Sequence, residues 1–208
     1  MGESFNRSTF IFLYIALLSI FLYHIVKNIF SQQIIYFLNE NNEVSLNAQN
    51  LSKENFNGSY KIIFIDTTTG NKAKEISQKV TINKRSKIKI DSFSSSKYIN
   101  DHTVMFAELY NGSGNLVNSN YFKTLPWKYY HLAKANISLT MDESKKYISV
   151  TSDKPSYFVD LYANGVEFSK RGFNIVNGEE IKVDILNDDS AVIEISDIKI
   201  FSLNNYLE

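Results

Sequence analysis

The stretch "FSKRGFNIVNGEEIKV", residues 168–183, contains two of the eight glycines in a chain that has only two prolines. Gly172 and Gly178 are six residues apart, and aromatic residues stand on both sides of the first. The second stands directly before "EEIKVDIL", residues 179–186, in which polar and apolar residues alternate. Alternation with a period of two is typical of a strand that has one buried face. The expected buried face consists of Ile181, Val183 and Ile185.

The two glycines predict how the chain enters this strand. Phe168 and Phe173 can pack into a core from either side of a bend at Gly172, and Gly178 supplies the turn from which the strand begins. This stretch therefore predicts a layered β-fold.

Outward from this stretch, short segments rich in β-branched and aromatic residues recur in two series. The first series comprises 43–49, 59–66, 74–82, 87–93, 103–110 and 115–122. The second comprises 136–141, 146–152, 156–163, 179–186 and 191–203. Asn164-Gly165 is the strongest hairpin signal, and it predicts a type I′ turn. Short strands at this spacing are typical of antiparallel sandwiches or barrels.

The two series predict two β-sandwiches in tandem, one over residues 34–125 and one over residues 126–208. The boundary falls near "LPWKYYHLAKA", residues 125–135, where Pro126 interrupts the strand pattern.

Composition excludes several classes of function. Lys and Arg number 22, as do Asp and Glu, so the basic surface of a nucleic-acid-binding protein is not expected. The chain has no cysteine, which excludes disulfides, thiolate nucleophiles and cysteine zinc sites. Its three histidines lack the spacing of metal ligands, so we expect neither a metal site nor a cofactor.

Residues 1–33 form the third expected region, an apolar helix at the N-terminus. The segment from Thr9 to Phe30 would span about 33 Å as a helix, enough to cross a bilayer core of about 30 Å. The alternatives are a cleaved signal peptide and a helix buried against the rest of the protein. The retained anchor predicts a single-pass membrane protein whose globular part is luminal or extracellular. Without an anchor, we expect a lysosomal or secreted protein.

Four N-glycosylation sequons after residue 31 fit a luminal location, although a chain so rich in Asn, Ser and Thr produces such triplets by chance. The possible acceptors are Asn50, Asn57, Asn111 and Asn136.

Two motifs of the second series resemble the C-terminal immunoglobulin-like domain of β-mannosidases in glycoside hydrolase family 2. They are "TSDKPSYFVDL" (151–161) and "FSKRGFNIVNGE" (168–179). The positions of the second that match the family motif are Phe168, Ser169, Phe173, Gly178 and Glu179. Lys170 and Arg171 replace an Asp-Asn pair, and Asn177 replaces a proline.

The resemblance extends towards the N-terminus. Residues 35–125 look like the preceding sandwich of the same enzymes, and "LYHIVKNIFSQ" (22–32) is similar to the segment that ends their catalytic barrel. The chain thus looks like the tail of a β-mannosidase, with its first helix a remnant of the barrel. The resemblance implies an all-β fold with two tandem immunoglobulin-like antiparallel β-sandwiches preceded by one N-terminal apolar helix.

The implied activity needs carboxylates that this chain does not present in a recognisable arrangement. A retaining glycosidase needs two carboxyl groups about 5–5.5 Å apart, and in the family both glutamates sit on barrel strands. "NENNE" (39–43) contains two Asn-Glu pairs, but we expect a solvated turn there. We therefore expect no catalytic residue in this chain and an accessory role beside a catalytic barrel. Two alternatives are a surface module that binds a glycan or protein, and a fragment of an active β-mannosidase that cleaves terminal β-mannosides.

Three aromatic residues of the boundary segment are the candidates for sugar binding: Trp127, Tyr129 and Tyr130. Aromatic faces stack on pyranose rings, but large rings also fill space where domains meet. We expect packing between the sandwiches to be the principal role of Trp127 and Tyr129. The expected partners are a catalytic barrel or a glycan, with the membrane as a further partner of the N-terminal helix.

Overall fold

The structure is a computed structural model that describes residues 31–41, 43–94, 102–176, 178–186 and 193–206. The expected N-terminal helix lies outside these residues, except for its last three positions. Gln33, the last of these positions, already belongs to a strand. Within the described ranges, no helix has the length and apolar character needed to span a membrane.

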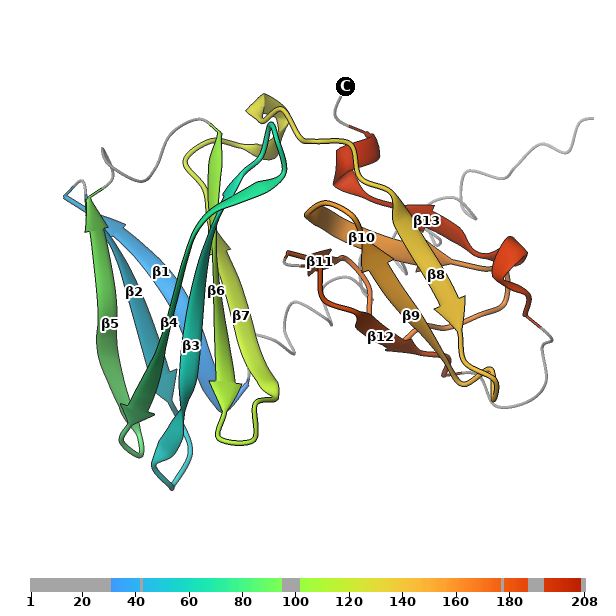
Figure 1. The fold of residues 1–208 in the computed structure, drawn as a ribbon. Coiled ribbons are helices and arrows are strands. Elements are labelled where there is room, and N and C mark those ends of the chain that lie inside the picture. The colour runs from blue at the N-terminus through green and yellow to red at the C-terminus, as the bar shows by residue number, and fades with distance from the viewer. Residues whose placement is uncertain (1–30, 42, 95–101, 177, 187–192, 207–208) are drawn as a thin grey trace, which may run out of the picture. The chain divides into compact units, whose positions relative to one another are not determined.

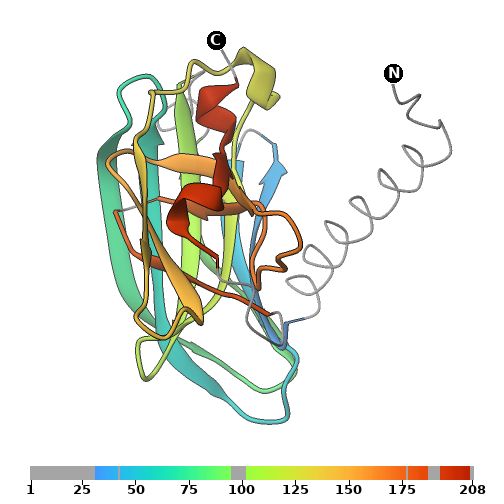
Figure 2. The same cartoon turned by 90° about the vertical axis from the view of Figure 1, so that its right-hand side faces the viewer.

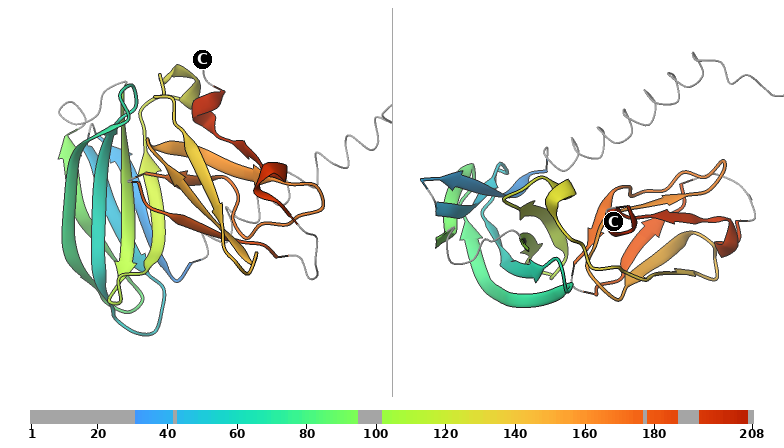
Figure 3. Two further views of the ribbon diagram at one scale, coloured as in Figure 1. Left: turned by 45° about the vertical axis from the view of Figure 1, so that its right-hand side comes forward. Right: turned by 90° about the horizontal axis from the view of Figure 1, so that it is seen from above.

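The described chain is all-β with several antiparallel sheets, as predicted. Seven strands form the first sandwich: β1 (Gln33–Glu40), β2 (Glu43–Asn50), β3 (Phe56–Asp66), β4 (Asn71–Ile82), β5 (Ser86–Ser94), β6 (Thr103–Asn111) and β7 (Leu116–Phe122). One sheet has the order β1-β2-β5, and the facing sheet has the order β4-β3-β6-β7 (Figure 1). Viewed from above, they form two layers (Figure 3, right).

Alternating side chains build the core between these two sheets. In β2, Val44, Leu46 and Ala48 are fully buried, and the residues between them are more exposed. They pack against Ile62 and Phe64 of β3 and against residues of β6. Each sheet thus buries one face against the other, which is the main stabilising contact of a sandwich.

Polar side chains close the open edge of the first sandwich. Asn118 and Asn120 of β7 bind the backbone of Ile35 in β1: the Asn118 Oδ1 accepts from its N–H at 3.1 Å, and the Asn120 Nδ2 donates to its carbonyl at 3.2 Å. These side chains replace a strand ladder between the two sheets, so backbone groups of β1 stay satisfied at the edge.

The second sandwich follows a linker that contains the 3-10 helix η1 (Trp127–Tyr129). Its strands are β8 (Ile137–Met141), β9 (Tyr147–Ser152), β10 (Ser156–Tyr162), β11 (Phe173–Ile175), β12 (Ile181–Asp184) and β13 (Lys199–Phe201), with 3-10 helices η2 (Ile195–Asp197) and η3 (Leu203–Asn205). The sheet orders are β12-β9-β8 and β11-β10-β13. Figure 2 shows η3 beside the linker, where the Asn204 Nδ2 donates to the Ala133 carbonyl at 2.8 Å.

The stretch around the two glycines adopts the predicted conformation. Gly172 and Gly178 have φ of 60° and 70°, values that favour glycine. Phe168 is buried and bridges to Ile185, whereas Phe173 is half-buried in β11. Along β12, Val183 is fully buried between exposed neighbours. The predicted bend and turn are therefore confirmed. The predicted strand is shorter than expected, Ile181–Asp184, and of its expected buried face Val183 is fully buried whereas Ile181 and Ile185 are half-buried.

Three local predictions need correction. The segment 191–203 is not one long strand: among its described residues, only Lys199–Phe201 are a strand, and Ile195–Asp197 form a 3-10 turn. Asp197 and Glu194 each accept a hydrogen bond from the other's backbone N–H, and this capping box favours the turn.

The turn at Asn164-Gly165 is not type I′. Such a turn needs positive φ at both central residues, and only Gly165 has it, at 72°. Strands β1 and β11 were not in the predicted series. β1 follows the apolar N-terminal segment without a turn signal, and β11 has only three residues.

Candidate functional site

The outer face of the sheet β4-β3-β6-β7 is apolar where a solvent-facing sheet would be polar. In β3 and β6, the residues that point away from the core are also buried, among them Ile63, Ile65, Val104 and Phe106. They form one cluster with Tyr130 and Leu132 of the linker and with Tyr157 and Val176 of the second sandwich. We call these eight residues the seam cluster. It joins the two sandwiches, and residues 31–208 form one compact unit.

Trp127 packs along this cluster through its ring. Its centroid lies 4.9 Å from that of Tyr157, 5.6 Å from that of Tyr121 and 5.7 Å from that of Tyr130. Tyr157 in turn stacks on Phe106 with centroids 5.9 Å apart and planes 13° apart. Rings from both sandwiches and the linker thus share one packed group.

Tyr130 fixes the linker. It is 3% exposed, and its Oη accepts hydrogen bonds from the backbone N–H groups of Thr124 at 3.1 Å and Leu125 at 3.4 Å. The phenol therefore satisfies the turn that carries the chain out of β7 and holds Trp127 against the second sandwich.

The three sugar-binding candidates do not present one common ring surface. Tyr130 is buried, Trp127 is half-buried in the aromatic group, and Tyr129 is 58% exposed with the Lys128 Nζ 4.8 Å from its ring centroid. A sugar reaching this segment would therefore meet the face of Tyr129 before the other two rings.

A different set of aromatic side chains is exposed on the second sandwich. Tyr162 of β10 is 49% exposed, Phe201 of β13 is 37% exposed, and Tyr206 is 67% exposed. Phe201 and Tyr206 stack, with centroids 6.3 Å and planes 19° apart. Tyr162 lies diagonally across the β10–β13 ladder from Phe201. We call these three residues the aromatic patch. The patch is not visible in the sequence, because Phe201 lies in the segment predicted as one long strand and Tyr206 lies just after it.

Beside the aromatic patch, Arg171 forms a bidentate ion pair with Asp160. Its Nε and Nη2 donate to the two carboxylate oxygens at 2.9 and 2.6 Å. Asp160 pairs with Phe201 in the β10–β13 ladder. Lys170 and Arg171 stand where the resembled family motif has an Asp-Asn pair, and in the present chain Arg171 has an internal partner in Asp160.

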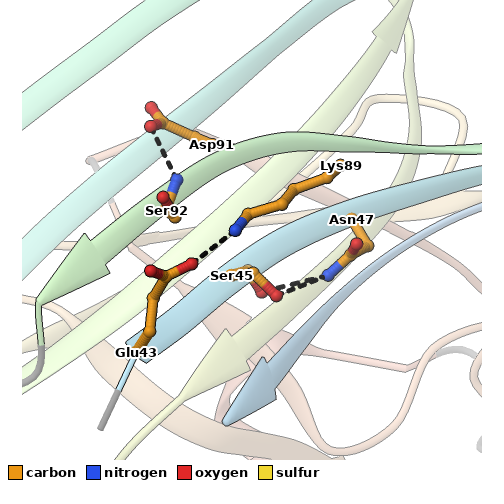
Figure 4. Close-up of polar contacts among 6 residues, drawn as sticks. All are labelled: Glu43, Ser45, Asn47, Lys89, Asp91 and Ser92. Carbon is orange, nitrogen blue, oxygen red and sulfur yellow. Dashed lines mark hydrogen bonds and ion pairs between the residues drawn. The ribbon is translucent and has the colours of Figure 1, made fainter. Parts of the chain in front are cut away.

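The glutamates of "NENNE" lie where a turn was predicted. Glu40 ends β1, Glu43 begins β2, and the two pair across the hairpin. Figure 4 shows Glu43 bonded to Lys89 of β5, with Ser45 and Asn47 further along β2. This hydrogen bond to Lys89 lowers the pKa of Glu43. The general acid of a glycosidase needs a raised pKa, so that it still carries its proton near pH 7.

Another carboxyl group of the described residues has the raised pKa that Glu43 lacks, and it lies on the outer face of the sheet β4-β3-β6-β7, beside the seam cluster. Glu108 of β6 is only 7% exposed, and burial raises its pKa. The Tyr110 Oη donates to its Oε2 at 2.6 Å. The sequence signal that could have drawn attention to Glu108 is its place as a single glutamate in the hydrophobic run "TVMFAELY", residues 103–110. Such a run is typical of a strand buried on both faces.

The four predicted glycan acceptors differ in their surroundings. Asn50 is fully buried, and its Nδ2 donates to backbone carbonyls of Glu54, Ile82 and Asn83. Asn57 and Asn136 are exposed, and Asn111 is partly exposed at the β6–β7 turn. Within the part of the chain that the structure describes, no three His, Asp or Glu side chains gather as a metal site.

The first sandwich matches a known domain family. Residues 42–129 match the model of the Mannosidase Ig/CBM-like domain, which confirms the resemblance for this segment. No curated protein matches the chain significantly in sequence.

Solved glycosidase structures share the fold over both sandwiches. A β-D-mannosidase from Dictyoglomus thermophilum is 18% identical with a TM-score of 0.70, covering 86% of this chain and 22% of that chain. An Amycolatopsis orientalis exo-chitosanase, CsxA, in complex with PNP-β-D-glucosamine is 12% identical with a TM-score of 0.55, covering 86% and 26%. The present chain thus spans about a quarter of the length of these enzymes.

Proposed function

We propose that this chain is a non-catalytic accessory region of a β-mannosidase-like glycoside hydrolase of family 2, inactive alone, whose two immunoglobulin-like sandwiches support a catalytic barrel. The observation that carries the proposal is the shared fold with a β-D-mannosidase over 86% of the chain. The family match of residues 42–129 supports the same role. Two sandwiches locked by the seam cluster would give a barrel one rigid support.

The carboxylates of the described residues support a non-catalytic role. Glu43 is exposed and paired with Lys89, and Glu108 is only 7% exposed. Retaining hydrolysis needs an acid and a nucleophile about 5–5.5 Å apart on either side of a bound sugar. Neither glutamate combines access to a sugar with the pKa of a general acid.

The inactivity can be tested directly on the full chain. With an aryl β-mannoside as substrate, we expect release of the phenol at the rate of the uncatalysed reaction. Turnover that a single carboxylate substitution abolishes would refute the proposal.

Support of a barrel can be tested in trans. The full chain is mixed with the catalytic barrel of a β-mannosidase whose own C-terminal sandwiches have been deleted. We expect a complex in size-exclusion chromatography and a higher melting temperature of the barrel. If upstream genomic DNA encodes a barrel in frame with this chain, that barrel is the one to use. Absence of both effects would contradict the accessory role.

The aromatic patch favours a second candidate function, the binding of a glycan. Exposed stacked rings next to charged hydrogen-bonding groups suit the apolar faces and hydroxyls of pyranose rings. Calorimetric titration with manno-oligosaccharides should show binding that Tyr206→Ala weakens at least about tenfold, a loss of about 1.4 kcal/mol. Trp127→Ala tests the earlier candidate segment, and we expect it to leave this binding unchanged. Equal affinity of the wild type and Tyr206→Ala would exclude the patch.

We also propose that the apolar segment 9–30 anchors the chain in a membrane, with residues 31–208 on the luminal or extracellular side. The support is the length of the uncharged run from Thr9 to Tyr23 and its continuation to Phe30. After alkaline carbonate extraction of expressing cells, the chain should stay in the membrane pellet. Its release into the supernatant would contradict anchoring.

A further inference from the structure

We propose that the proton on Glu108 controls the contact between the two sandwiches: the contact is closed while Glu108 is neutral and loosens when its carboxylate faces Glu179 across the seam. This inference concerns the fold of residues 31–208 and does not depend on the proposed function.

Glu108 lies on the outer face of β6. It follows Val104 and Phe106 on the face that the seam cluster covers, and it is 7% exposed. Tyr110 continues the same face and donates its Oη to the Glu108 Oε2 at 2.6 Å. A carboxyl group thus occupies the polar end of an apolar contact.

The second sandwich supplies another acid. Glu179 lies between β11 and β12, and its Oε1 accepts the backbone N–H of Val176 at 2.9 Å. Val176 is itself a member of the seam cluster. The Glu179 carboxylate is therefore tied to the segment that packs on β6, and its charge acts on Glu108 from across the seam.

Two further charges of the described residues act on Glu108, and both come from the first sandwich. Lys61 lies directly opposite on β3, and Glu75 of β4 also acts on it, while the opposite residue on β7 is the uncharged Ser119. Glu75 forms an ion pair with Lys72, which neutralises part of its charge. The positive charge of Lys61 therefore acts on Glu108 together with two negative charges, that of Glu75 in the first sandwich and that of Glu179 in the second.

These surroundings favour the neutral form of Glu108. Burial makes the largest contribution to its raised pKa, the hydrogen bond from Tyr110 opposes it, and the charge of Glu179 adds to it. When pH rises through this pKa, the proton passes to solvent, and the new carboxylate is a buried charge that the charge of Glu179 repels. Water entering the seam relieves both the desolvation and the repulsion, so the contact loosens.

Trp127 is a built-in probe of this change. It is the only tryptophan of the chain, and its ring packs against Tyr157 of the second sandwich. In a pH titration of the full chain, we expect its emission to shift to longer wavelength above the ordinary glutamate pKa of 4.5. Far-ultraviolet circular dichroism should stay constant through the transition, because the sandwiches themselves remain folded.

Three variants give different expected shifts. Glu108→Gln should remove the transition, Glu179→Gln should move its midpoint to lower pH, and Tyr110→Phe should move it to higher pH. Glu43→Gln is the matched control, since this exposed acid lies on the other sheet, and it should leave the midpoint unchanged. A transition that persists in Glu108→Gln would overturn the proposal. If that variant does not fold, unchanged or reversed midpoints in the other two variants would overturn it.

Discussion

Asn50 shows how much one side chain can hold together in this fold. It is fully buried at the end of β2, and its Nδ2 reaches the carbonyls of Ile82 and Asn83 at the end of β4. Its Oδ1 accepts from Ser52 and from the Nε2 of Gln33 in β1. Asn50 therefore ties strands of both sheets to one another. The sequon Asn50-Leu51-Ser52 predicted that Asn50 could carry a glycan. These three residues alone do not reveal that the Asn50 side chain is buried.

Replacing Asn50 tests this role. Asn50→Ala leaves several buried backbone groups without their partner, so the free energy of unfolding should fall by about 1–3 kcal/mol. Asn50→Asp should lower the free energy of unfolding at least as much, because it replaces the Nδ2 donor, which faces backbone carbonyls, with a second oxygen acceptor. Urea denaturation measures both. Asn57→Ala, at an exposed sequon, is the control with an expected change within about 0.5 kcal/mol, and an equally small effect at Asn50 would contradict its structural role.

At Arg171, the departure from the family motif has a local explanation. The bidentate pair with Asp160 needs the planar guanidinium fork, which lysine lacks. We expect Arg171→Lys to lower the free energy of unfolding by about 1 kcal/mol, measured by chemical denaturation. The neighbouring Lys170→Arg serves as the control, since Lys170 is exposed. Equal stability of Arg171→Lys and the wild type would mean that the fork geometry contributes nothing.

Among the elements, β3 and β6 were predicted as strands and are buried on both faces. Their hydrophobic runs were visible in the sequence, yet a run of this kind does not say what covers its second face. The cover comes from the linker and from β10 and its neighbours, which lie far along the chain. Conversely, β1 was not predicted because no turn residue separates it from the apolar segment before it. The strand predicted over 191–203 was too long because it included the 3-10 turn Ile195–Asp197.

Gly58 of β3 provides a test of how closely β3 and β6 approach. A Cβ built on Gly58 would lie 2.0 Å from the backbone carbonyl oxygen of Tyr110, so a side chain there must push the strands apart. We expect Gly58→Ala to destabilise the protein by about 1–3 kcal/mol in thermal or urea unfolding.

The control for Gly58 is the nearby Gly112→Ala. There the added Cβ meets its nearest neighbour, the Asn57 carbonyl oxygen, at an ordinary 3.5 Å. We expect a much smaller change, and similar losses at the two glycines would mean that the strand contact at Gly58 is not tight.

For the whole molecule, sequence analysis predicted a boundary at Pro126 but not the strength of the contact there. Packing between the sandwiches was the expected main role of Trp127 and Tyr129. Trp127 does pack there, beside Tyr130, whereas Tyr129 is exposed. Tyr157 and Phe106, which stack in the same group, are separated by 51 residues in the numbering, and no local pattern pairs them. The candidate acid Glu108 escaped prediction for the same reason, since its covering segment is distant in sequence.

The raised pKa of Glu108 predicts a pH dependence of global stability. Because its pKa is higher in the folded than in the unfolded state, its stabilising contribution is complete below the unfolded value near 4.5 and is lost as pH rises through the folded pKa. Glu108→Gln should therefore unfold at the same denaturant concentration as the wild type below that pH. Well above the folded pKa it should be the more stable protein. A wild type that is the more stable at high pH would contradict the sign of this shift.

The seam cluster joins residues 31–208 into one unit. Differential scanning calorimetry of the full chain below the folded pKa of Glu108 tests this directly. We predict a single unfolding transition of these residues whose calorimetric and van't Hoff enthalpies agree, as for one cooperative unit. Tyr157→Ala should separate it into two transitions, one for each sandwich. Two independent transitions already present in the wild type would contradict the account.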